Sequence, residues 1–157
     1  MSIFVANESG APIDLDDLVS LSTYVLKSLR IHPQAELSLV LVGVDAMEAL
    51  HVQWMDEPGP TDVLAFPQDE LRPPKDDVEP EPGLLGDVVI CPAVAATQAV
   101  EHHHSTDDEV HLLCTHGILH LLGYDHREAE EKQEMFALQD SLLAAWRTSR
   151  REAARSS

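Results

Sequence analysis

The chain has 157 residues, and its 28 acidic against 10 basic side chains give a formal net charge of −18. This length suits one domain with a sizeable core, and a hydrophobic content of 44% is an ordinary globular value. Because nonspecific nucleic-acid binders usually carry a basic surface, the charge argues against that class of protein. The sequence has neither an apolar run long enough for a membrane span nor a signal-peptide layout at its start, so we expect a cytoplasmic protein.

The first half of the chain alternates strand and helix patterns. Residues 3–6 form a short strand candidate, and residues 14–30 carry apolar side chains at helical spacing. The apolar, β-branched run 35–43 predicts a buried strand. A short helix at 45–54 and a strand at 61–67 follow.

The second half is mainly helical. Residues 71–83 hold four prolines and several acids and predict a loop, which we expect to be mobile. A fourth strand is expected at 84–92, followed by helices at 93–103, 109–122 and 128–146.

Three positions predict helix boundaries. Asp14 can cap the helix that follows it, and Thr106 with Glu109 matches a capping box. Gly123 is a natural C-terminal stop. The pattern as a whole favours an α+β domain, with a small mixed four-stranded sheet packed by about five helices, although an α/β layering is also compatible. We expect one domain at 1–146 and a flexible, arginine-rich C-terminal tail at 147–157.

The segment THGILHLLGYDH has the histidine spacing of a zinc hydrolase. On a helix, His116 and His120 lie on one face, and a turn at Gly123 can bring His126 over the same point. Three histidines leave a fourth position for water, which is typical of catalytic zinc. The sequence therefore predicts one zinc ion per chain, held by His116, His120 and His126.

Two other interpretations of these histidines stay open. They could be ordinary core or surface residues of an amphipathic helix. They could also form a closed structural site, with Cys91 or Cys114 as fourth ligand. The separate run 102–104 at a helix end is interpreted as a solvated histidine cluster rather than an auxiliary metal site.

Gly117 stands where a zinc peptidase carries its catalytic glutamate. Without that base, amide cleavage is disfavoured, whereas phosphodiester cleavage can use a Lewis acid directly. No catalytic residue is assigned; Asp125 is a weak candidate for orienting a histidine or binding the attacking water, and an exposed turn aspartate is the alternative.

These motifs resemble the YbeY family of rRNA maturation endoribonucleases. HGILHLLGYDH matches that family's H-G-x-L-H-L-x-G-Y-D-H signature, and PTDVLAFP and GDVVICPAVAATQA resemble two further segments, so the likeness spans roughly 3–146. The resemblance implies a zinc-dependent, single-strand-directed endoribonuclease in the cytoplasm. Its implied roles are 3′-end maturation of small-subunit rRNA and ribosome quality control. It also implies a metal-ligand helix distantly similar to that of metzincins.

The resemblance also implies partners and shows one departure. The expected partners are single-stranded RNA and rRNA, the small ribosomal subunit with its proteins, and an assembly GTPase, but neither membrane nor DNA. Met55 stands where the family commonly has an arginine, so either Arg72, Arg127 or a partner supplies that charge or nuclease activity is weak. Two alternative functions are a non-catalytic ribosome-assembly factor with a mainly structural metal, and a metallopeptidase.

Overall fold

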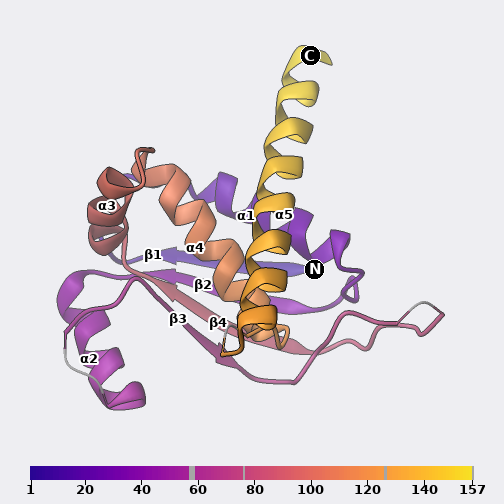
Figure 1. The fold of residues 1–157 in the computed structure, drawn as a ribbon, viewed down its shortest axis with the longest axis horizontal. Helices are drawn as coiled ribbons and strands as arrows, with labels where there is room; N and C mark the ends of the chain where they lie inside the picture. The colour runs from indigo at the N-terminus through magenta and orange to yellow at the C-terminus, as the bar shows by residue number, and fades with distance from the viewer. Residues whose placement is uncertain (57–58, 76, 126, 157) are drawn as a thin grey trace.

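A four-stranded mixed sheet forms the centre of the protein (Figure 1). The computed structural model describes residues 1–56, 59–75, 77–125 and 127–156, so the predicted ligand His126 lies outside the described residues. The strand order is β1-β2-β4-β3, in which β1, β2 and β4 are parallel and β3 is antiparallel to β4. The strands are β1 (Ser2–Asn7), β2 (Glu36–Leu41), β3 (Val63–Pro67) and β4 (Leu84–Ile90).

Five helices complete the fold of the described residues, and the predicted α+β class with a mixed four-stranded sheet is confirmed. None of these helices is long and apolar enough to cross a membrane. In Figure 1, α1, α4 and α5 lie over one face of the sheet and α2 lies on the other side. The helices are α1 (Leu15–Ser28), α2 (Val44–Met55), α3 (Pro92–Glu101), α4 (Thr106–Leu121) and α5 (Ala129–Ser156).

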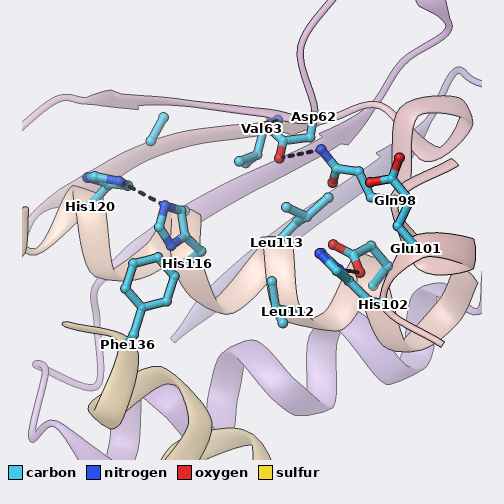
Figure 2. Close-up of a pocket in the computed structure, with 13 residues that line it drawn as sticks. Asp62, Val63, Gln98, Glu101, His102, Leu112, Leu113, His116, His120 and Phe136 are labelled. Carbon is cyan, nitrogen blue, oxygen red and sulfur yellow. Dashed lines mark hydrogen bonds and ion pairs between the residues drawn. The ribbon is translucent and has the colours of Figure 1, made fainter. Parts of the chain in front are cut away.

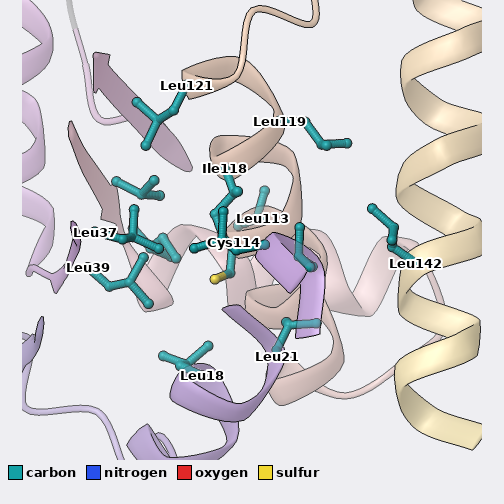
Figure 3. Packing of buried hydrophobic residues seen from close by; sticks show 14 of the residues in the cluster. Leu18, Leu21, Leu37, Leu39, Leu113, Cys114, Ile118, Leu119, Leu121 and Leu142 are labelled. Atoms are coloured by element: carbon teal, nitrogen blue, oxygen red, sulfur yellow. The ribbon is translucent and has the colours of Figure 1, made fainter. Parts of the chain in front are cut away.

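The alternation of side chains along the strands divides the core into two clusters. Val88 and Ile90 of β4 face α1, α4 and α5, whereas Val89 between them faces the opposite side. Figure 3 shows the larger cluster, in which leucines of α1, β2, α4 and α5 meet. The smaller cluster packs under α2 around Met47 and Leu64. Helix α4 contacts α1, α3, α5 and the strands β3 and β4, and a cavity lies along it.

Gly117 lets α4 lie directly on the sheet. A Cβ atom at this position would come within 2.6 Å of Val88 Cγ1 and 3.3 Å of Val63 Cγ2. Valine is stiff and cannot move away easily. The absence of a glutamate between the two helix histidines therefore has a structural reason, since the helix–sheet contact leaves no room for a side chain there.

The capping box predicted at Thr106 is wrong. The N-cap of α4 is Ser105, which has an extended backbone and accepts a hydrogen bond from the backbone N–H of Asp108 at 3.0 Å. Glu109 is turned toward two histidines instead of the start of the helix. The Asp14 cap of α1 is confirmed, since its side chain accepts from the N–H of Asp17.

Replacing Ser105 by alanine should therefore destabilise the protein by about 1 kcal/mol, because one N–H of the first turn loses its acceptor. Thr106→Ala, one position further, is the matched control and should cost less. Urea unfolding of both variants measures the difference. A larger loss for Thr106→Ala would contradict the assignment of the cap.

The C-terminal residues 147–156 continue α5 as helix, although we expected a frayed tail there. Arg150 donates to Asp17 of α1 at 2.7 Å and lies 4.7 Å from the ring of Trp146. Arg147 pairs with Asp108 of α4 at 3.6 Å. These contacts join the first half of the arginine-rich segment to the body of the protein.

Candidate metal centre

A cavity of about 470 Å³ runs along the exposed side of α4. Figure 2 shows its lining, which combines His116 and His120 of α4 with Phe136 of α5 at one end. Asp62, directly before β3, and His102, directly after α3, line the other end. The spacing of four residues places both α4 histidines on one helix face, as predicted, and their ring centroids are 4.6 Å apart.

The two α4 histidines point their Nε2 atoms at each other. His120 Nε2 lies 3.0 Å from His116 Nε2, and the other ring nitrogen of His116, Nδ1, lies 2.9 Å from Oε1 of Gln139. An amide oxygen can only accept, so His116 Nδ1 carries the hydrogen and its Nε2 presents a lone pair to the cavity. Gln139 is buried, which holds the imidazole in this orientation.

This arrangement fits a zinc ion. Two nitrogen ligands at about 2.1 Å from a tetrahedral zinc are about 3.4 Å apart, so the observed separation needs only a small adjustment. The hydrogen bond from His116 to Gln139 is the kind of outer contact that metal-binding histidines usually make. Two of the three predicted ligands are therefore brought together, and His126, outside the described residues, stays a prediction as the third.

Gln139 is a site residue that the sequence analysis missed, since nothing in a helical pattern tells a buried glutamine from an exposed one. Replacing it by leucine removes the acceptor of His116 Nδ1 and should lower zinc affinity about 10–100-fold. Gln133→Leu, on the exposed side of the same helix, is the control. Competition with a chromophoric chelator measures both, and unchanged affinity in Gln139→Leu would show that the hydrogen bond does not orient a ligand.

The cavity is acidic. Among the described residues that line it there are three carboxylates, Asp62, Glu101 and Glu109, but no lysine or arginine. Both oxygens of Asp62 are engaged, with the N–H of Val63 at 2.7 Å and with Gln98 Nε2 at 3.1 Å. We therefore assign Asp62 the role of holding β3 against α3.

The arginines expected to replace the one that the family commonly has at position 55 do not line this cavity. Met55 is the half-exposed last residue of α2 and does not line the cavity. Arg72 donates to the carbonyl oxygen of Leu121 at the end of α4, with a donor–acceptor distance of 3.5 Å. Arg127 Nε donates to Asp125 at 2.9 Å. Asp125 thus has a partly exposed carboxylate beside the predicted third ligand and stays a candidate only.

Neither cysteine lines the cavity. Cys114 is fully buried between α4 and α1, beside the hydroxyl of Ser22, and burial raises its thiol pKa to about 11. Cys91 is fully buried in the smaller core cluster under α2. The closed structural site with a cysteine as fourth ligand is therefore not supported.

A second group of candidate ligands lies at the other end of the cavity. His102 Nδ1 and His104 Nε2 contact the same carboxylate oxygen of Glu109, which is 1% exposed. The run 102–104 is therefore not simply a solvated cluster, and the three side chains are grouped as metal ligands could be. The sequence analysis did not predict this group, because the spacing of Glu109 from Thr106 had assigned Glu109 to a helix cap. The hydrogen bond that His102 donates to the Glu109 carboxylate raises the pKa of His102.

Comparison with known proteins identifies the family. The family model described as "Endoribonuclease YbeY" matches residues 5–147. The chain is 62% identical to the endoribonuclease YbeY of Thermobifida fusca, covering 97% of this chain and 98% of that protein. It is 59% identical to the endoribonuclease YbeY of Acidothermus cellulolyticus, covering 99% and 97%. The solution structure of TM1509 from Thermotoga maritima superposes with a TM-score of 0.65 at 27% identity, covering 99% and 95%. The chain belongs to the endoribonuclease YbeY family.

Proposed function

We propose that the protein is a zinc-dependent, single-strand-directed endoribonuclease of the cytoplasm. In this proposal it trims the 3′ end of small-subunit rRNA and takes part in ribosome quality control. Family membership and the printed names of the relatives support the class of reaction. The observation that carries the proposal is the pair of converging Nε2 atoms of His116 and His120 in an open cavity.

Each residue of the site has a distinct part in this proposal. His116, His120 and His126 hold the zinc ion, and Gln139 fixes the ring of His116 through Nδ1. When bound, zinc supplies a Lewis acid that polarises a phosphoryl oxygen and favours ionisation of water at neutral pH. Asp125 stays the candidate for accepting a proton near the third ligand.

The shape of the cavity supports a single-stranded substrate. Its volume of about 470 Å³ is within the range of small-ligand sites and suits one nucleotide better than a duplex. Phe136 lies 5.7 Å from His116, centroid to centroid, and offers an aromatic surface on which an unstacked base can lie. Because Gly117 excludes the peptidase glutamate, the site favours phosphodiester over amide cleavage.

The test uses zinc-loaded protein with an RNA that carries the unprocessed 3′ end of small-subunit rRNA. The parent, His116→Ala and the control His32→Ala, all cleared of contaminating nuclease, are incubated with this RNA, and the products are mapped. We expect the same cleavage positions for the parent and for His32→Ala, and none for His116→Ala.

Two results would count against the proposal. Equal cleavage by all three proteins would mean that the activity does not come from this site. Absence of cleavage by the parent, on naked RNA and on small-subunit particles alike, would favour the ribosome-assembly factor. The acidic surface of such a factor would suit basic ribosomal proteins.

A further inference from the structure

The turn between α3 and α4 holds two imidazoles against one buried carboxylate. His102 Nδ1 lies 2.8 Å and His104 Nε2 lies 2.5 Å from Oε1 of Glu109. One ligand atom from each of the three side chains lies within 4.8 Å of the others. Figure 2 shows His102 at the end of the cavity distant from His116.

The backbone of this turn is fixed so that alternate histidines face the same way. His103 has a left-handed conformation, with φ of 59°, which non-glycine residues seldom adopt. The N–H groups of His102 and His104 donate to the carbonyl oxygens of Gln98 and Ala99 of α3. Ser105 then caps α4. The backbone at His102 and His104 is therefore fixed by the end of α3 and the start of α4, and this places both imidazoles near Glu109.

The group has an excess of negative charge. The Glu109 side chain is 1% exposed, and a buried carboxylate needs a compensating cation or full hydrogen bonding. Glu101 lines the same cavity, and its negative charge also raises the pKa of His102. Protonation of His102, whose pKa is raised by Glu109, would offset one of the two negative charges, whereas a bound divalent cation would offset both.

We propose that His102, His104 and Glu109 form a second divalent-metal site, suited to zinc and similar ions. Two imidazole nitrogens and one carboxylate oxygen match the ligand types of three-ligand zinc sites, which leave a fourth position for water or substrate. A tetrahedral zinc ion holds its ligand atoms about 3.4 Å apart, so each imidazole nitrogen must move away from the Glu109 oxygen by less than about 1 Å. Both can do so, since the side chains of His102 and His104 are 53% and 28% exposed.

This second site is separate from the His116–His120 pair. Glu109 precedes His116 by seven residues, which is about 10 Å along a helix axis. Metal ions that share one reacting group lie about 3.5–4 Å apart, so the two sites cannot form a two-metal centre of that kind. A cation here would offset the acidic end of the cavity. Its binding does not depend on the proposed nuclease activity.

The test counts metal ions on the folded chain. Zinc equivalents are measured by chelator competition for the parent, His102→Ala/His104→Ala and His116→Ala/His120→Ala, with His103→Asn as the matched control. Asparagine tolerates the left-handed conformation of residue 103. We expect two equivalents for the parent and the control and one for each double variant. Cobalt substitution should give the intense visible absorption of four-coordinate Co²⁺ in both double variants.

Other results would overturn the proposal. One such result is a parent that binds a single zinc equivalent, which His102→Ala/His104→Ala retains and His116→Ala/His120→Ala loses. His102 and His104 would then be hydrogen-bond partners of Glu109 and not metal ligands. Thermal unfolding followed by circular dichroism shows whether each variant folds. Should the double variant at 102 and 104 fail to fold, His102→Ala alone removes the more exposed ligand and should still lower the affinity of one equivalent at least tenfold. Unchanged affinity in that variant would also refute the site.

Discussion

Replacing His120 by alanine is expected to lower zinc affinity by more than 100-fold and to abolish RNA cleavage. The side chain supplies one of the two Nε2 atoms that converge in the cavity, 3.0 Å apart. Loss of an outer-shell partner typically costs 10–100-fold in metal affinity, and loss of a ligand should exceed that range. Chelator competition and cleavage of the rRNA 3′-end substrate measure the two effects.

His111→Ala is not a suitable control, because His111 is buried against Trp146, with ring centroids 5.1 Å apart. His51→Ala is better, since the ring of His51 lies outside the cavity and contacts the carbonyl oxygen of Gly59 at 2.9 Å. It should retain zinc affinity and cleavage. If His120→Ala cleaved RNA at the parent's rate, the pair could not be the reaction centre.

Replacing Gly117 by alanine is expected to lower the free energy of unfolding by about 1–2 kcal/mol. A Cβ only 2.6 Å from a stiff valine puts the overpacking cost at the upper end of its usual range, about 2–3 kcal/mol, and alanine in a helix interior regains about 1 kcal/mol over glycine. Gly117→Glu, which restores the peptidase glutamate, should cost several kcal/mol more because it also buries a carboxylate. We expect that variant to unfold at physiological temperature, since typical domains are stable by only about 5–15 kcal/mol.

Gly43→Ala is the matched control for Gly117→Ala. Among the described residues, no heavy atom beyond its chain neighbours and its own helix backbone lies within 4 Å of a Cβ at Gly43, and its φ of −76° suits any residue. Gly43 is the N-cap of α2, so alanine should cost less than about 1 kcal/mol there. Urea unfolding compares the variants. If Gly117→Ala were as stable as the parent or more so, close packing would not explain the glycine.

Local patterns were sufficient to predict the helices and strands and to place two of the predicted ligands side by side. Helical periodicity and strand alternation predicted all nine elements of the described residues, because both arise from which side chains face the core. The pair His116 and His120 followed from a spacing of four on one helix, which is a property of the helix alone.

Features that depend on tertiary packing were not predicted. Gln139 lies 23 residues from His116 in the chain, and only the packing of α5 on α4 brings its amide to that ring. Glu109 had the spacing of a capping residue, but burial directs it to His102 and His104 while Ser105 takes the cap. The packing role of Gly117 could not be predicted either, because it depends on how closely α4 approaches Val88 of β4.

The most direct test of the proposed metal centre at His116 and His120 is anomalous diffraction at the zinc edge from crystals of zinc-loaded protein. We predict a peak about 2.1 Å from the Nε2 atoms of both histidines, with the hydrogen bond from His116 to Gln139 retained. Zinc-loaded, cleavage-competent protein with no peak between these two atoms would contradict the account.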